Sequence, residues 1–322
     1  MPHDPRPSHF RRFAWLVLAY TFAVIVFGAW VRITGSGAGC GQHWPTCHGE
    51  VLHRPETVET VIELTHRVTS GLSLVAVLVL LVIGLRRYDR GHPVRWGVAL
   101  ATVFMILEAL IGAGLVLLEL VGRNDSASRA VVMAIHLSNT CLLTGAMTVA
   151  AWFGGESNRG TRPRLGLRGA GPKFWYLLAG LGGVIVVAMS GAVTALGDTL
   201  YPVLSEGGVA EHLQADQGLT SHFLQRMRIV HPLLAMGVGL YLLWLTITQP
   251  EFPERLWVGR SAKLVAVLVL IQLCAGVVNI VLSAPGWMQL VHLSTGTALW
   301  IALVTLALAV LEPDPSRGSD PL

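Results

Sequence analysis

The stretch "IELTHRVTSGLSLVAVLVLLVIGL", residues 62–85, decides the fold of this chain. From residue 68 to residue 85 no side chain is charged. A helix that crosses the hydrocarbon core of a bilayer needs about 20 mostly apolar residues. Glu63, His66 and Arg67 stand just before this run. The sequence therefore predicts a transmembrane helix with three polar side chains at its N-terminal end.

The composition of the whole chain also indicates a membrane protein. Of its 322 residues, 53% are apolar and 13% are charged, whereas a soluble domain is about 25% charged. The formal net charge of +4 is modest, and no basic patch is interleaved with aromatic residues. These features exclude nucleic acid as a partner and make the lipid bilayer the expected environment.

Seven further segments have the length and apolarity of a transmembrane helix. They are residues 13–31, 96–118, 130–153, 174–197, 229–250 and two parts of 264–311, which are separated by "SAPG" at 283–286. We therefore expect an all-α integral membrane protein with eight transmembrane helices.

The distribution of Lys and Arg predicts the orientation of these helices. Positive residues gather in the N-terminal tail and in alternate loops: Arg6, Arg11, Arg12, Arg86, Arg87, Arg90, Arg95, Arg159, Arg162, Arg164, Arg168, Lys173, Arg255, Arg260 and Lys263. Cytoplasmic loops carry such an excess, so both termini are expected in the cytoplasm. The acidic loop at 198–221 is expected outside.

The second half of the chain repeats the first. Gly28 of "FGAWVRITGSG" and Gly191 of "MSGAVTALGDT" are 163 residues apart, and "HLSNT" and "HLSTG" are 156 residues apart. An even number of helices separates the copies, so both cross the membrane in the same direction. We expect two tandem pseudo-symmetric four-helix bundles, residues 1–153 and 174–322, joined by a cytoplasmic linker at 154–173.

Four histidines match between the halves, His66 with His231 and His136 with His292. Each half draws its pair from its second and fourth helices, close to their outer ends. Two neutral imidazoles that face each other across a four-helix bundle can ligate a haem iron. A structural zinc ion, the competing use, takes four ligands, and each half supplies two clear ones. The sequence therefore favours one bis-histidine haem site in each half, near the outer face.

Three arginines near the outer ends of the helices are candidates for pairing with haem propionates: Arg32, Arg67 and Arg228. Arg67 follows His66 directly, and Arg228 precedes His231 by three residues. Long basic side chains at a membrane interface also snorkel to lipid headgroups, and this alternative stays open.

The two halves differ in their carboxylates. Glu63 precedes His66 by three residues, which puts both on one helix face, and the repeat has Arg228 at that position. A haem on which chemistry is done can use a carboxylate, so Glu63 is the catalytic candidate; the alternative is a first-turn residue favoured by the helix dipole. Glu108 lies near the middle of its span, where the repeat has Gln272. It is either a proton relay or an interhelical hydrogen-bonding group.

Cys40 and Cys47 lie in the first outer loop, "GCGQHWPTCHG". The outer side of the membrane is oxidising, which favours a disulfide between them. A zinc site with His43 or His48 is the alternative.

Taken together, these motifs resemble the haem A synthase family over nearly the whole chain. The loop "RITGSGAGCGQHWPTCHG" at 32–49 is similar to the first outer loop of that family. The segments "ELTHR", "HLSNT", "VHP" and "HLSTG" are similar to its four haem-ligand segments. Many members have Pro-Asp-Trp-Pro between the cysteines; this chain keeps Trp44 and Pro45 but lacks the acid.

The resemblance implies an enzyme of the bacterial plasma membrane. It would oxidise the C8 methyl of haem O to a formyl group and so give haem A for cytochrome oxidase. His66 and His136 would bind the substrate haem, beside Glu63 as the essential acid. His231 and His292 would ligate a resident haem b.

The resemblance further implies a Cys40–Cys47 disulfide, with haem O synthase and cytochrome oxidase assembly proteins as partners.

Two other functions compete. A di-haem b-type electron-transfer protein explains four histidines but not why one half alone carries Glu63. Transporters often have inverted repeats with sites near the midplane, whereas these repeats are parallel and their polar pairs shallow.

Overall fold

A computed structural model of the chain describes residues 8–51, 53–155, 171–203, 216, 218, 221–248 and 255–312. Its helices are α1 (His9–Ile33), the short 3-10 helix η1 (Ser36–Ala38), α2 (Val58–Arg87), α3 (Pro93–Leu117), α4 (Ala127–Phe153), α5 (Gly171–Leu200), α7 (Phe223–Thr248), α8 (Leu256–Val281) and α9 (Gly286–Leu311). Eight of these described helices are long and apolar enough to cross a membrane. The predicted all-α, eight-span membrane fold is confirmed.

Polar residues define where several helices begin. The side chains of Ser8, Thr57 and Ser126 each accept a hydrogen bond of 3.2 Å from the backbone N–H three residues later. These N-caps satisfy amides that the first helical turn leaves free. The helices therefore extend beyond the uncharged runs of the sequence, and α2 takes in Glu63 and His66.

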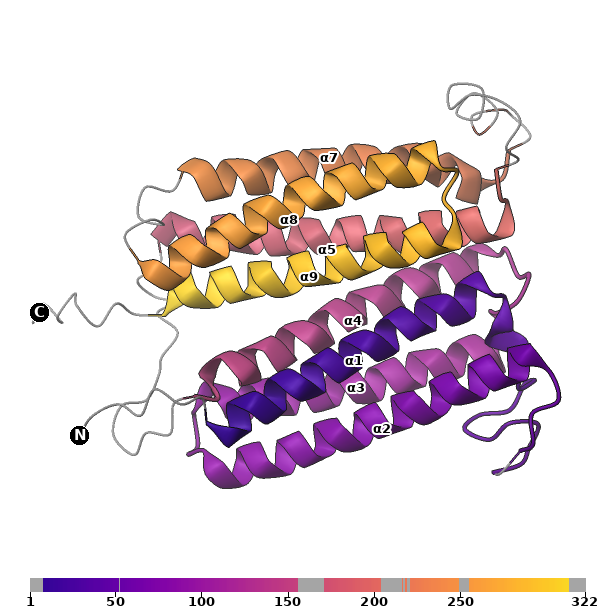
Figure 1. Cartoon of the computed structure of the whole chain (residues 1–322), viewed down its shortest axis with the longest axis horizontal. Coiled ribbons are helices and arrows are strands. Elements are labelled where there is room, and N and C mark those ends of the chain that lie inside the picture. The colour runs from indigo at the N-terminus through magenta and orange to yellow at the C-terminus, as the bar shows by residue number, and fades with distance from the viewer. Residues whose placement is uncertain are drawn as a thin grey trace, which may run out of the picture.

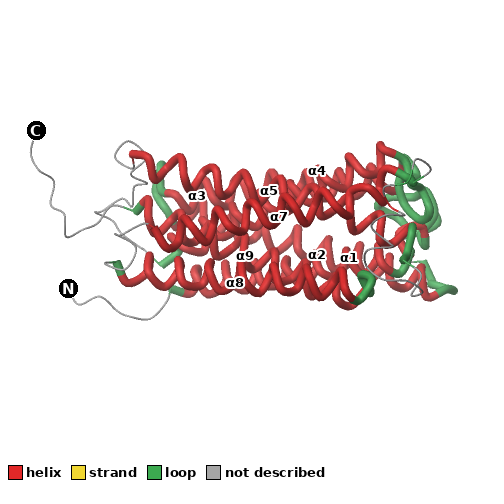
Figure 2. Tube along the Cα trace, turned by 90° about the horizontal axis from the view of Figure 1, so that it is seen from above, coloured by secondary structure: helices red, strands yellow, loops and turns green. Residues whose placement is uncertain are grey.

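The helices form two side-by-side four-helix bundles (Figure 1). In the first, α1 to α4 pack in chain order and α4 returns to α1; in the second, α5, α7, α8 and α9 do the same. All eight run along one common axis (Figure 2). The start of α1 and the end of α9 lie at the same end of the molecule. Most of the predicted linker, residues 156–170, lies outside the described residues.

The two bundles meet where α4 packs on α5 and α9, and where α1 packs on α9. The indole N–H of Trp300 in α9 donates a hydrogen bond of 2.7 Å to the backbone carbonyl of Cys141 in α4. The indole ring packs closely on Gly145 of α4, where a Cβ would lie 3.4 Å from it. Away from this seam, apolar side chains such as Leu240 and Leu270 are more than half exposed, as lipid-facing residues are.

Candidate functional site: two histidine pairs

His231 of α7 and His292 of α9 face each other inside the second bundle. Their ring centres are 6.3 Å apart and the ring planes are nearly perpendicular, at 88°. Two imidazoles that sandwich one metal ion with bonds of about 2 Å have ring centres roughly 6 Å apart. The pair therefore has the separation that a bis-histidine haem site requires.

Glycines let the neighbouring helices approach these rings. A Cβ on Gly191 of α5 would lie 3.0 Å from the His231 ring, and one on Gly276 of α8 would lie 3.3 Å from the His292 ring. The first bundle repeats the first of these contacts, since a Cβ on Gly28 of α1 would lie 3.1 Å from the ring of His66, but a Cβ on Gly112, the counterpart of Gly276, would meet nothing within 4 Å. The repeated glycines noted in the sequence are thus explained by close helix–imidazole packing.

His66 of α2 and His136 of α4 occupy the corresponding places in the first bundle. The Nδ1 atoms of His66, His136 and His292 are buried and make no hydrogen bond within the described residues. Buried polar atoms are nearly always paired, so the nitrogens of His66 and His292 call for a partner that the described residues do not supply, whereas that of His136 lies 3.5 Å from Oε1 of Glu108. The donor set and its unpaired nitrogens fit a haem in each half.

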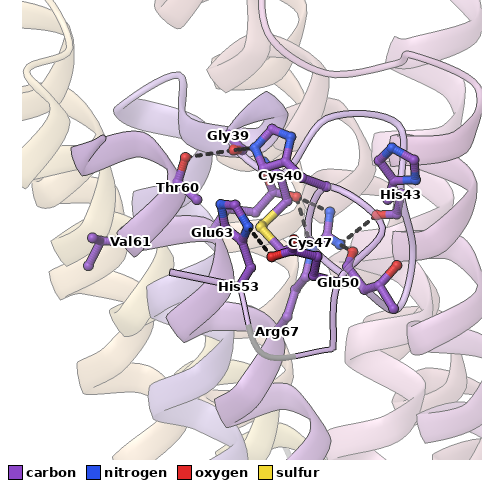
Figure 3. Close-up of a disulfide and its surroundings, with 12 residues drawn as sticks. Gly39, Cys40, His43, Cys47, Glu50, His53, Thr60, Val61, Glu63 and Arg67 are labelled. Carbon is purple, nitrogen blue, oxygen red and sulfur yellow. Dashed lines mark hydrogen bonds and ion pairs between the residues drawn. A yellow bond between two sulfur atoms is a disulfide. The ribbon is translucent and has the colours of Figure 1, made fainter. Parts of the chain in front are cut away.

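Glu63 lies one turn before His66 and is only 3% exposed. Its Oε2 accepts a hydrogen bond of 2.8 Å from the backbone N–H of Cys40. Its Oε1 accepts a hydrogen bond of 3.0 Å from Nε of Arg67, and a second from Nη2 of the same guanidinium. The carboxylate is thus clamped between α2 and the outer loop (Figure 3).

Arg67 also binds the loop that carries the cysteines. Its Nη1 donates hydrogen bonds of 2.6 Å to the backbone carbonyls of His43 and Thr46. The guanidinium of Arg67 therefore joins Glu63 to two points of the loop, His43 and Thr46. Sequence reasoning placed Arg67 near the site as a propionate candidate and missed this contact, because it depends on how the loop folds back.

The loop packs directly on α2. A Cβ on Gly39 would lie 2.5 Å from the backbone of Glu59, so only glycine fits there. The hydroxyl of Thr60 donates a hydrogen bond of 2.7 Å to the carbonyl of Gly39. This close approach is what brings the N–H of Cys40, the next residue, within reach of Glu63.

Cys40 and Cys47 form a disulfide, as predicted. Ligand atoms of Cys47, His48 and His53 lie within 4.8 Å of one another. The sulfur of Cys47 is bonded to Cys40, however, and a zinc ion takes a free thiolate. The disulfide, rather than the zinc alternative, therefore accounts for the cysteine pair.

The second half reverses the charges of this arrangement. Arg228 occupies the place of Glu63 in the repeat, and its Nε donates a hydrogen bond of 2.8 Å to Asp198. Its Nη1 lies 2.9 Å from Oδ1 of Asp216, and its Nη2 donates to backbone carbonyls. Pro232 stands where Arg67 would be. Only the first half therefore presents a buried carboxylate on the histidine helix.

Arg32, the third propionate candidate, connects the two halves. From the end of α1 its guanidinium donates hydrogen bonds of 2.5 Å to the carbonyl of Ala195 in α5 and of 2.9 Å to Gln289 in α9. It also donates to the hydroxyl of Thr199. Pairing of Arg32 with a haem propionate stays a prediction.

A second connection between the halves lies at the same end of the molecule. The phenol of Tyr201, just after α5, donates a hydrogen bond of 2.5 Å to Asp125 in the loop before α4. This bond lowers the pKa of Asp125, and the carboxylate raises the pKa of Tyr201. The two bundles are thereby joined through polar contacts as well as through the apolar seam.

Ser190 is a site residue that sequence reasoning missed. Its hydroxyl lies 3.0 Å from Nδ1 of His231. The repeat offset of 163 pairs it with Phe27, whose ring meets His66 edge-on at 5.6 Å. Applying that offset to every residue of α1 would have shown that Ser190 of the second half replaces Phe27 of the first.

Comparisons with known proteins agree with this architecture. The sequence profile of the family described as cytochrome oxidase assembly protein (COX15-CtaA) matches residues 11–304. A "Heme A synthase" of Halalkalibacterium halodurans is 27% identical over 292 residues, which are 87% of this chain and 86% of that protein. A "Heme A synthase" of Geobacillus kaustophilus is 36% identical over 129 residues, 39% of this chain and 38% of that protein.

A longer relative carries a different name. The "Protoheme IX farnesyltransferase" of Thermus thermophilus is 45% identical over 313 residues, which are 97% of this chain but 50% of that protein. The chain thus spans about half the length of the Thermus relative. The family match, by contrast, includes both histidine pairs, Glu63 and the disulfide, and it confirms the resemblance to haem A synthases. The chain belongs to the COX15-CtaA family of cytochrome oxidase assembly proteins.

Proposed function

We propose that this chain is a haem A synthase, which oxidises the C8 methyl of haem O to a formyl group and so supplies haem A to cytochrome oxidase. His66 and His136 hold the substrate haem, and His231 and His292 hold a resident haem b. One observation carries the proposal: two histidine pairs occupy matching places, and among the described residues only the first pair has a buried carboxylate on its own helix, Glu63, a turn before His66.

The reaction explains why one half needs a carboxylate. Oxidation of a methyl to a formyl group removes four electrons in two-electron stages and draws positive charge onto the reacting carbon. Preorganised groups of opposite charge stabilise such a transition state most effectively. Glu63, held by Arg67 and by the N–H of Cys40, supplies a negative charge that does not have to reorient. Haem b, when bound, supplies an iron that changes its oxidation state by one electron.

In this proposal the outer loop also shields Glu63 from water. It covers Glu63, which is only 3% exposed. Exclusion of water strengthens the electrostatic effect of a carboxylate and protects reactive intermediates. The disulfide and Arg67 hold the loop in this covering position.

The name of the Thermus relative raises farnesyl transfer as an alternative activity. A prenyl diphosphate is bound through Mg²⁺, which takes carboxylate ligands together with the phosphates. Aspartates are scattered singly along this chain: Asp4, Asp89, Asp125, Asp198, Asp216, Asp314 and Asp320. We therefore propose that these 322 residues take haem O as substrate and do not carry out the farnesyl transfer. In our proposal the chain lies in the bacterial plasma membrane, with both termini cytoplasmic and the haem sites near the outer face.

Haem extraction tests the proposed function. Cells that make this protein together with a haem O synthase are extracted, and their haems are separated by chromatography. We expect haem A with the wild type and none with Glu63→Gln. Glu59→Gln is the matched control, since it removes an exposed carboxylate from the same helix. If red purified protein yields only haems B and O with the wild type, the di-haem electron-transfer function replaces ours.

A further inference from the structure

The first outer loop presents two imidazoles and a carboxylate close to its disulfide. Nδ1 of His53 lies 3.1 Å from Oε2 of Glu50 (Figure 3). A ring nitrogen of His48 lies within 4.8 Å of one of His53, and the two ring centres are 4.8 Å apart. Three groups that ligate metal ions therefore meet on a loop that carries neither histidine pair.

A tight turn sets the relative positions of His48 and Glu50. The N–H of Cys47 donates a hydrogen bond of 3.1 Å to the carbonyl of Glu50, and the N–H of Glu50 donates one of 2.9 Å to the carbonyl of Cys47. The two residues between them, His48 and Gly49, have φ angles of 50° and 84°. A type I′ turn requires such a pair of positive φ angles. The turn is thus closed at both ends, and it fixes the backbone of His48 beside that of Glu50.

His48 is also held to the first part of the loop. Its backbone N–H donates a hydrogen bond of 3.1 Å to the carbonyl of Cys40. Its Nε2 donates one of 3.0 Å to the carbonyl of Gly39. A carbonyl or carboxylate partner on one ring nitrogen is the support that metal-binding histidines almost always have. The ring of His48 is therefore oriented before any ion binds.

We propose that His48, His53 and Glu50 form a Zn²⁺ site on the outer loop. Two imidazoles and one carboxylate are a donor set that holds zinc in proteins, with water in the fourth place. Ligand atoms about 2.1 Å from a tetrahedral ion lie roughly 3.4 Å apart, close to the 3.1 Å between His53 and Glu50. The nitrogens of His48 and His53 have to approach each other by about 1.4 Å at most. Rotation of the exposed His48 side chain allows this.

The disulfide decides which kind of metal site is available. The sulfur of Cys47 lies within 4.8 Å of the two imidazole nitrogens, but it is bonded to Cys40 and supplies no thiolate. Mg²⁺ and Ca²⁺ take oxygen ligands, whereas most donors here are nitrogens. A zinc ion on His48 braces the turn against Gly39, the residue before the N–H that holds Glu63. The site does not depend on the proposed function.

Zinc titration of the purified full chain tests the site. The protein is made without an affinity tag and keeps its disulfide and the haem that it binds. We expect one Zn²⁺ per chain in the wild type and binding at least about tenfold weaker in each of three variants, His53→Ala, Glu50→Gln and His48→Asn. Asparagine tolerates the positive φ of His48. His43→Ala is the matched control: it removes an exposed histidine of the same loop, which Figure 3 shows apart from His53, and should bind like the wild type.

X-ray absorption at the zinc edge identifies the ligands of the bound ion. Nitrogen and oxygen neighbours at about 2.0–2.1 Å without sulfur support the site, whereas a sulfur neighbour at about 2.3 Å overturns it, because zinc has then opened the disulfide. Wild-type affinity in both His53→Ala and Glu50→Gln also overturns it, as does an equal loss in His43→Ala. If His48→Asn does not fold, these two variants decide. Zinc binding by a protein that makes no haem A leaves the site standing and rejects the synthase alone.

Discussion

The backbone N–H of Cys40 donates a hydrogen bond of 2.8 Å to the carboxylate of Glu63. This contact joins the disulfide-closed loop to the one buried acid that distinguishes the first histidine pair from the second. The loop and the acid therefore form a single unit, and changes in either should disturb the same chemistry.

The disulfide should matter through Glu63. Replacing both cysteines, Cys40→Ser with Cys47→Ser, frees the loop, and the N–H of residue 40 no longer holds the carboxylate. We expect the haem A yield to fall toward that of Glu63→Gln while haem stays bound in the second half. Haem extraction and the visible spectrum of the purified protein measure the two effects. A wild-type yield from the double variant would show that the loop does not position the acid.

Arg67 should not be replaceable by lysine. A lysine keeps the charge but cannot bind Glu63 through two nitrogens and the loop carbonyls at once. Misplacement of a catalytic group by about 1 Å can cost roughly 100-fold in rate, and we expect a loss of that order in Arg67→Lys. Haem A formation per bound haem is the measurement. If Arg67 instead serves a propionate, the variant will lose haem from the first half rather than rate.

Ser190 should set how firmly the second half holds its haem. Its hydroxyl orients His231, and loss of such a partner typically costs roughly 10-fold to 100-fold in metal affinity. We expect Ser190→Ala to release haem faster to an apo-globin acceptor. The reciprocal variant, Phe27→Ser, offers His66 the same hydroxyl and should slow release from the first half. Equal release rates in wild type and Ser190→Ala would argue against this role.

The inner loop should make the protein acid-sensitive through His92. Nδ1 of His92 accepts a hydrogen bond of 3.2 Å from the N–H of Val94 at the start of α3, and burial lowers the pKa of this imidazole. The folded state therefore binds the proton less readily than the unfolded chain, whose histidine has a pKa of about 6.5. The contribution of neutral His92 to the free energy of unfolding is complete above that pH. It declines as the pH falls toward the lower pKa that His92 has in the folded state.

Thermal unfolding in detergent at pH 7.5 and at pH 5 checks this dependence. His92→Asn keeps a side chain that caps a helix and removes the titration. The wild type should lose more of its unfolding temperature on acidification than the variant does. Equal losses would place the acid sensitivity elsewhere.

Much of this protein follows from the order of its residues alone. Uncharged runs of membrane length predict the eight helices, because an unpaired backbone cannot exist in hydrocarbon. The repeat predicts the two bundles and pairs His66 with His231 and His136 with His292. The contrast between Glu63 and Arg228 also follows from the sequence, because repeated helices place equivalent residues at the same depth in the membrane.

The partners of those side chains were decided by the tertiary structure. The position of Arg67 in the sequence does not predict its hydrogen bonds to Glu63 and to two loop carbonyls. Those bonds depend on how Gly39 packs on α2. Glu108 was recognised as an unusual mid-span acid, yet its place beside His136 depends on how α3 packs on α4. Helix periodicity fixes which face a residue occupies, whereas the identity of its neighbour is set by interhelical packing over long sequence distances.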